Sequence, residues 1–281
     1  MTSVAVPAGR SVLRRRPAGA GALTSVSGAG LGVAVLWFSL LVLLPLSAVV
    51  LRAAEGGWGP AWQTITNGQT LAAVRLTVGM ALVVTAVNVV MGTLIAWVLV
   101  RDRFVGQRLL EVLIDIPFAL PTIVAGLVLL SLYGSDSPIG PDVANNRWSV
   151  FLAYLFVTLP FVVRTVQPVL AELDREVEEA AASLGASRLT VFRRIVLPSL
   201  TPAIAAGAAL SFARGVSEYG SLVLLSGNLP YKTEVTSVRI LSSIENDNLA
   251  GAAAVATLLL LISFTVIVIL DLLQRRMVRR G

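Results

Sequence analysis

The sequence predicts an all-α membrane protein with six membrane-spanning helices, and three observations support this fold class. Of its 281 residues, 56% are hydrophobic and only 14% are charged, whereas soluble domains carry about 25% charged residues. The apolar residues gather in six runs, each long enough to cross the hydrocarbon core of a bilayer, which takes about 20 residues. Basic residues cluster in the segments that would lie on one side of the membrane.

The six runs define the predicted spans, which cover residues 29–51, 71–100, 109–133, 148–170, 201–225 and 249–273. The first follows four arginines, but it is too long for a typical signal-peptide core and no clear cleavage site follows it. We therefore expect it to be retained. The second run exceeds the bilayer thickness and is expected to tilt or to project beyond it.

Charge counting predicts the orientation. Fifteen basic residues lie in the N-terminal tail, the 101–108 and 171–200 loops and the C-terminus, against five in the other loops: Arg52, Arg75, Arg147, Lys232 and Arg239. Because basic residues concentrate in cytoplasmic loops, both termini and the 171–200 loop are predicted to be cytoplasmic. Five aromatic residues near the opposite boundaries fit interfacial anchors: Trp58, Trp62, Tyr133, Trp148 and Tyr231.

Composition excludes several classes of function. The chain has no Cys and no His, so disulfides, Cys/His zinc sites and a Ser-His triad are excluded. It has no GxxxxGK[ST] phosphate-binding loop, so we expect no ATP site of its own and no cofactor. The net charge of +6 follows from the cytoplasmic loops rather than from a nucleic-acid partner.

The 171–200 loop predicts a helix, a tight turn and a second helix. Leu173, Val177, Ala180 and Leu184 form one apolar stripe of a helix over 172–184, and acidic residues at its start suit the helix dipole. Gly185 is expected to end this helix in the left-handed conformation.

The second helix is predicted to run from Arg188 to Leu197. Ser187 is its expected N-cap, and Pro198 is expected to stop it. If no partner existed, an amphipathic loop of this kind could simply lie on the bilayer surface.

Residues 179–198 match the pattern E-A-A-x3-G-x9-I-x-L-P at every fixed position: Glu179, Ala180, Ala181, Gly185, Ile195, Leu197 and Pro198. This pattern resembles the loop by which permease subunits of type I ABC importers dock onto their ATPase. Two further segments, Asp115 to Leu127 and Ala213 to Ile240, are similar to the T-type permeases of the sulfate/thiosulfate subgroup. Ser217 stands where that subgroup has Gly.

The resemblance runs from about Thr70 to Leu273 and implies a domain organisation. Residues 1–28 are expected to be a disordered cytoplasmic tail, residues 29–69 the first span and an outer loop, and residues 70–281 the permease core. We call residues 171–200 the docking loop.

The resemblance also implies the complex of which the chain would be a subunit. The expected partners are a second homologous permease, two ATPase subunits that bind ATP, an extracytoplasmic sulfate-binding protein and the lipid bilayer. The chain would be a non-catalytic, multi-pass subunit of the bacterial cytoplasmic membrane that moves sulfate or thiosulfate inward.

Ionisable residues and prolines inside the spans are candidates for the translocation pathway. Arg214 and Glu218 share one face of the fifth span at i, i+4, and they either line the pathway or form a self-neutralising structural pair. Pro117 and Pro121 are expected to kink the third span and free backbone carbonyls. Arg164 is a second candidate for the pathway, although we rather expect it to snorkel to the cytoplasmic interface, and Asp115 is expected to be structural or interfacial.

Three alternatives remain open from the sequence. The same machine could carry another oxyanion, such as molybdate or tungstate. An intramembrane enzyme would need a catalytic constellation, which the lack of His and Cys makes hard to build. A stand-alone secondary transporter would not need an ATPase-docking motif and would usually show inverted repeats.

Overall fold

The computed structural model describes residues 25–137 and 141–278. The chain divides into two compact units, Met1–Ala48 and Val49–Gly281. In the first unit, helix α1 (Ser25–Phe38) passes through a π-helical turn, η1 (Ser39–Leu43), into α2 (Leu44–Glu55). The most apolar window of this helix contains no buried residue, as expected for a span that faces lipid.

The second unit begins within α2 and continues through helices only in its described part. In chain order these are α3 (Trp58–Thr66), α4 (Gly68–Arg101), α5 (Gln107–Ala119), α6 (Thr122–Tyr133), α7 (Arg147–Glu172), α8 (Arg175–Ser183), α9 (Arg188–Val191), η2 (Phe192–Val196, π-helical), α10 (Leu197–Val216), α11 (Gly220–Leu225), α12 (Thr236–Glu245) and α13 (Leu249–Val278). The all-α fold class is confirmed for the described residues.

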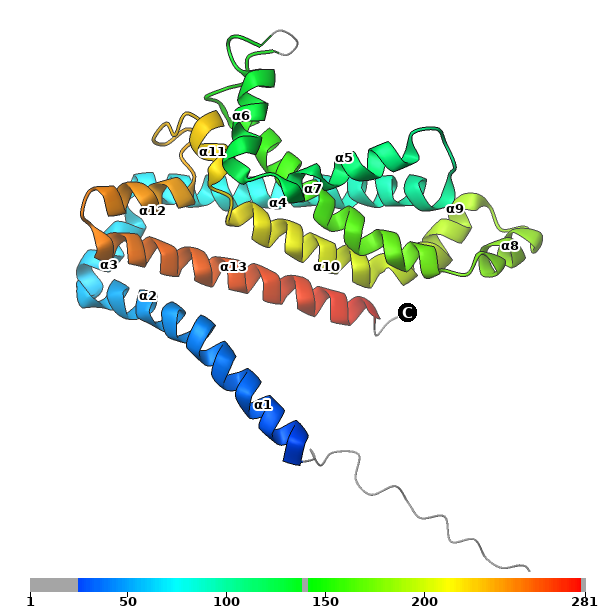
Figure 1. The fold of residues 1–281 in the computed structure, drawn as a ribbon, viewed down its shortest axis with the longest axis horizontal. Coiled ribbons are helices and arrows are strands. Elements are labelled where there is room, and N and C mark those ends of the chain that lie inside the picture. Colours follow the sequence, from blue (N-terminus) through cyan, green and yellow to red (C-terminus); the bar gives the residue numbers. More distant parts are fainter. Residues whose placement is uncertain (1–24, 138–140, 279–281) are drawn as a thin grey trace, which may run out of the picture. The chain divides into compact units, whose positions relative to one another are not determined.

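The core of this unit is made by α4, α7 and α10, which pack against one another (Figure 1). One buried cluster surrounds Tyr154 and Phe212, and a second surrounds Leu170 and Leu200. Small residues bring the helices close together: a Cβ on Gly207 would lie 2.3 Å from Oγ1 of Thr165. This is the usual way in which helices pack inside a membrane, where lipid offers no hydrophobic drive between them.

Five helices are long and apolar enough to cross a membrane, and α5 with α6 makes a sixth crossing if this bent pair is counted as one span. The predicted span over 109–133 is broken at Pro121, where a kink was expected, and the break is larger than a kink. The chain bends by 118° between α5 and α6, because Leu120 is extended with ψ near 134°, as steric contact with the following proline favours. Pro121 then precedes the first residue of α6.

The fifth predicted span is also interrupted, and the prediction that Pro198 stops a helix is wrong. Helix runs without a break from Arg188 through α9, η2 and α10 to Val216, and then stops before α11. The π-helical turn immediately before Leu197 changes the hydrogen-bonding register. Pro198 then lies in the first turn of α10, where its missing N–H is tolerated.

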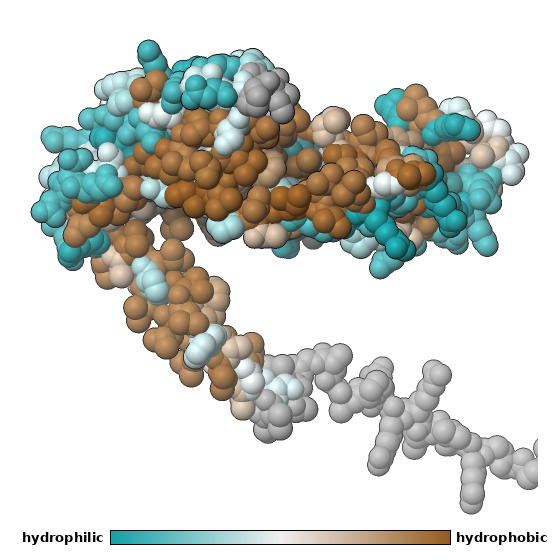
Figure 2. All heavy atoms as spheres, turned by 45° about the horizontal axis from the view of Figure 1, so that its top comes forward, coloured by the Kyte–Doolittle hydropathy of each residue, from teal (hydrophilic) through white to brown (hydrophobic). Residues whose placement is uncertain are grey.

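Loops of the same predicted side gather at the same end of the unit. α8, α9 and the turn between α4 and α5 lie together at one end, and α3, α11 and α12 at the other (Figure 1). A band of hydrophobic side chains covers the middle of the displayed face, with hydrophilic side chains towards the ends (Figure 2). Most of the predicted tail, residues 1–24, lies outside the described residues, and α1 begins within its last four residues.

Candidate functional site

The first helix of the docking loop forms, but it runs from Arg175 to Ser183 and not over the predicted 172–184, because α7 continues to Glu172. The side chain of Asp174 caps α8 by accepting a hydrogen bond from the N–H of Glu176 at 2.9 Å. Glu176 and Glu178 fall in the first turn, where the positive end of the helix dipole favours acidic groups. Leu173 precedes the cap and packs against the buried cluster that surrounds Leu170 and Leu200.

The rest of the predicted apolar stripe is exposed in the part of the chain that the structure describes. Val177 and Leu184 are 52% and 90% exposed, and Leu189 beyond the turn is 64% exposed. Exposed large hydrophobic side chains grouped on a polar, charged loop are typical of a protein–protein contact. This part of the loop therefore presents a face that is free to receive a partner.

Gly185 ends α8 in the conformation that the sequence predicts, with φ of +87°. Its N–H donates to the carbonyl of Ala182 at 2.9 Å, and the N–H of Ala186 donates to the carbonyl of Ala181 at 3.1 Å. These two bonds are the Schellman motif, which satisfies carbonyls left free at the helix end. Ser187 then caps α9 by accepting from the N–H of Thr190 at 3.3 Å, so the predicted helix–turn–helix is present.

The docking loop is tied to the end of α4. Arg101 forms a salt bridge with Glu178 and lies over the ring of Trp97 at 5.8 Å. Arg175 donates to the carbonyl of Val100 at 3.1 Å. These contacts fix α8 relative to the end of α4.

The seven fixed positions of the E-A-A-x3-G-x9-I-x-L-P pattern lie along the docking loop. Glu179, Ala180, Gly185, Leu197 and Pro198 are exposed, while Ala181 and Ile195 are half-buried. The first four fixed positions lie on α8 and its turn. The last three lie where η2 passes into α10.

Arg214 and Glu218 do form the predicted pair, with 2.7 Å between Nη2 and Oε2. Glu218, however, lies in the break after α10 rather than within a continuous helix. Its side chain is fully buried, and its Oε1 accepts from the N–H and the hydroxyl of Ser221, each at 2.9 Å. Glu218 therefore neutralises Arg214 and also caps the start of α11.

Arg164 and Asp115 form a second pair, which the sequence did not reveal. Nε of Arg164 donates to Oδ1 of Asp115 at 2.7 Å, and Nη1 donates to Oε1 of Gln167 at 2.8 Å. Arg164 is therefore paired, and the expectation that it snorkels to the cytoplasmic interface stays a prediction. The two residues are 49 positions apart, and only the packing of α5 on α7 brings them together.

The two helix breaks also meet. Pro121 precedes α6, the break at 217–219 precedes α11, and α6 packs against α11. A Cβ on Gly126 would lie 2.8 Å from the backbone of Ser221, and one on Gly220 would lie 2.2 Å from Oγ1 of Thr122. Pro117 lies inside α5 without ending it.

Close packing of two interrupted helices is a feature of transporter pathways, but the sequence signalled only the proline break. The described residues contain no group of three acidic side chains that could hold a metal ion. The fold and the exposed helix–turn–helix together define a multi-pass membrane protein with a polar, helical loop at one end.

Comparison with known proteins identifies the family. Residues 88–280, more than half of the chain, match the family described as "Binding-protein-dependent transport system inner membrane component". The chain belongs to this family and is a multi-pass inner-membrane protein of the ABC importer permease type.

Individual relatives agree with this family. The sulfate transport system permease protein CysT of Salmonella typhimurium is 44% identical over 257 residues, which is 89% of this chain and 93% of that protein. A probable sulfate transport system permease protein of the alga Zygnema circumcarinatum is 39% identical over 85% of this chain and 86% of its own length.

Solved structures share the fold at lower identity. A chain of the bacterial alginate ABC transporter, in complex with a periplasmic protein that holds an alginate pentasaccharide, has a TM-score of 0.75 at 14% identity, covering 90% of this chain and 95% of its own. A chain of the MetNI methionine ABC transporter in an inward-facing conformation has a TM-score of 0.53 at 17% identity, covering 75% and 94%.

Proposed function

We propose that this chain is the permease subunit of an ATP-driven importer that carries sulfate, and with it thiosulfate, into the cell. The observation that supports this most strongly is the similarity to sulfate permeases, which is 44% over 89% of the chain and includes the docking loop. Thiosulfate follows from its chemistry, since it is a divalent oxyanion of similar shape to sulfate.

The exposed helix–turn–helix is proposed to bind an ATPase subunit. Val177, Leu184 and Leu189 offer exposed apolar area, and the Schellman turn gives the tip of the loop a defined shape. Glu179, Ala180, Ala181 and Gly185 lie on the element that would touch the ATPase. Ile195, Leu197 and Pro198 join this element to the fifth span.

Continuous helix from Arg188 to Val216 gives a physical route for coupling. A displacement of α9 by the ATPase would be carried along a single helical rod into α10. Because α10 packs against both α4 and α7, the displacement would move the core of the permease. The chain itself would bind no ATP and catalyse no reaction.

The remaining partners follow from the same proposal. A second homologous permease would complete the pathway, two ATPase subunits would power it, and an extracytoplasmic binding protein would deliver the anion. Both termini and the docking loop would face the cytoplasm, because fifteen of the basic residues outside the spans lie on that side.

Uptake measurements in cells test the proposal. Cells that lack this chain should lose accumulation of radiolabelled sulfate and regain it when the chain is returned. Excess thiosulfate should compete with the label, whereas molybdate and tungstate should compete weakly. Restored uptake of molybdate with no change in sulfate uptake would show that the machine carries a different oxyanion.

A further inference from the structure

Two arginines of the second unit are already neutralised. Arg214 pairs with Glu218, and Arg164 pairs with Asp115. A divalent anion could use either arginine only by competing with its carboxylate, and the Glu218 side chain is fully buried. Cations that have no carboxylate partner are free to attract an anion.

Three such cations surround one groove at the end of the unit opposite the docking loop. The groove has a volume of about 410 Å³, and its floor is a face of α4 that carries Ala72, Leu76, Gly79, Met80 and Val83. Arg75, Arg147 and Lys232 line its rim, and all three are exposed. Within the described residues, none of them forms a salt bridge. We call this the basic groove.

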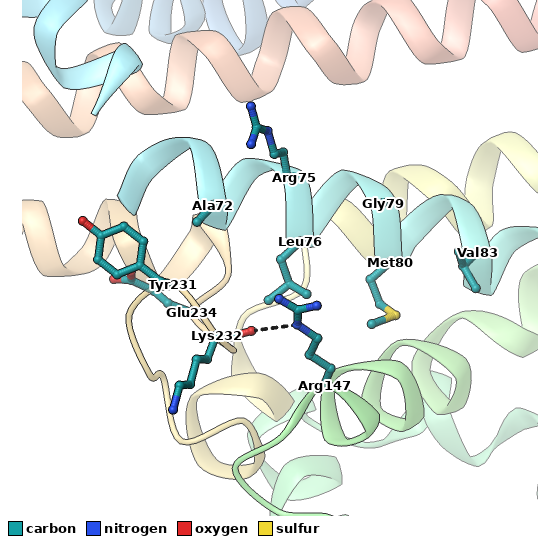
Figure 3. Close-up of a pocket in the computed structure, with 10 residues that line it drawn as sticks. All are labelled: Ala72, Arg75, Leu76, Gly79, Met80, Val83, Arg147, Tyr231, Lys232 and Glu234. Carbon is teal, nitrogen blue, oxygen red and sulfur yellow. Dashed lines mark hydrogen bonds between the residues drawn. The ribbon is translucent and has the colours of Figure 1, made fainter. Parts of the chain in front are cut away.

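The three side chains come from three separate parts of the chain (Figure 3). Arg75 leaves one side of α4, Arg147 reaches towards Leu76 and Met80 from the start of α7, and Lys232 extends from the loop before α12. Nε of Arg147 donates to the carbonyl of Lys232 at 3.4 Å. All three line the groove, but they point in different directions and do not converge on one point (Figure 3).

One carboxylate, that of Glu234, lines the groove, and it is buried and hydrogen-bonded. Glu234 is 5% exposed, and its Oε2 accepts from Nε2 of Gln69 at 2.7 Å. With three cations and one carboxylate, the lining carries a formal charge of +2. This is equal and opposite to the charge of a divalent oxyanion.

The loop that presents Lys232 is built to hold one shape. The carbonyl of Leu229 accepts from the N–H groups of Lys232, Thr233 and Glu234, at 3.1, 2.9 and 3.0 Å. Oγ1 of Thr233 donates to the carbonyl of Ser226 at 2.6 Å. Such bonds fix the backbone while leaving the lysine side chain free.

We propose that the basic groove receives the divalent oxyanion when the binding protein releases it on the outer side, and that it raises the local concentration of the anion at the mouth of the pathway; this deepens the proposed function and rests on it. Clefts lined by one sign of charge focus the field and raise the local concentration of oppositely charged ligands by about 10- to 1000-fold. Cations that do not converge on one point hold an anion weakly, and a permease needs weak holding because it must pass the anion on.

Reconstituted transporter tests the proposal. The complete complex, with its partner permease, ATPase and binding protein, is placed in proteoliposomes, and radiolabelled sulfate uptake is measured beside ATP hydrolysis. Arg75→Gln should lower sulfate carried per ATP severalfold, and Arg75→Lys should restore it. Replacing Arg75, Arg147 and Lys232 together by Gln should lower it by about tenfold or more, the lower end of the range for charged clefts.

The matched control is Arg52→Gln, which removes an exposed arginine on the same predicted side but outside the groove lining. It should leave sulfate carried per ATP unchanged. Unchanged transport in the triple variant would overturn the proposal. The proposal would also be overturned if the triple variant differed from the unmodified complex only in needing a higher concentration of binding protein to stimulate ATP hydrolysis. The three cations would then serve to dock that protein.

Two further outcomes are decisive. If the triple variant does not assemble, the single variant Arg75→Gln, at an exposed position, gives the answer. Lowered sulfate per ATP supports the proposal, and unchanged sulfate per ATP overturns it. Failure of the proposed function would look different, because the unmodified complex would then carry no sulfate.

Discussion

Replacing Gly185 by Val tests the turn on which the docking loop depends. Gly185 has φ of +87°, a conformation that costs a residue with a Cβ about 1–2 kcal/mol. No atom lies within 4 Å of the position that a Cβ would occupy, so the change acts through the backbone and not through a clash. A cost of this size shifts the equilibrium between the native turn and its alternatives by about 5- to 30-fold.

The assay is co-purification of the ATPase with membranes that carry the variant. Gly185→Val should insert normally but retain the ATPase about 5- to 30-fold less well, with a matching loss of uptake. Gly185→Asn should behave almost like the unmodified chain, because Asn adopts the left-handed conformation more readily than other residues with side chains.

Gly106 provides a matched control. It also has positive φ, at +90°, and open space around its missing side chain, but it lies before α5 and outside the docking loop. Gly106→Val should strain its own turn and spare ATPase binding. If Gly185→Val retains the ATPase at full yield and transports normally, the turn does not shape the docking surface.

Three further predictions concern orientation, the buried pair and the tip of the loop. A reporter fused after Arg280 should lie in the cytoplasm and one at Ser137 outside; the reverse result at either position would contradict the six-span orientation. Arg214→Gln alone should destabilise the protein by about 3–5 kcal/mol, because it leaves the buried carboxylate of Glu218 unpaired. Arg214→Gln combined with Glu218→Gln should recover assembly and near-normal sulfate uptake; poor uptake with intact hydrolysis would instead give Arg214 a role in the pathway. Leu184→Cys places the only thiol of the chain on a docking-loop position that is 90% exposed, and it should cross-link to the ATPase; an active complex that does not cross-link would show that the tip lies outside the interface.

Local signals in the sequence predicted the docking loop well. Gly185 and Ser187 act on hydrogen bonds within a few residues of themselves, so their residue types were sufficient. The six apolar runs were visible for the same reason, since each helix in a bilayer satisfies its own backbone.

Features that depend on packing were not visible. Pro198 is ordinarily a helix stop, but a π-helical turn just before it lets the helix continue. The pairing of Arg164 with Asp115 arises only when α5 packs on α7. The basic groove likewise joins residues 75, 147 and 232, which the sequence shows only as separate charges on one predicted side.

Sulfate accumulation in ATP-loaded proteoliposomes tests the central claim most directly. The purified complex is reconstituted with ATP at the face that carries the docking loop, and binding protein with radiolabelled sulfate is supplied at the other. The account predicts uphill accumulation that requires both ATP and the binding protein and that falls with Gly185→Val in step with ATPase binding. Accumulation that is unchanged without ATP, or that continues in a complex without the ATPase, would contradict it.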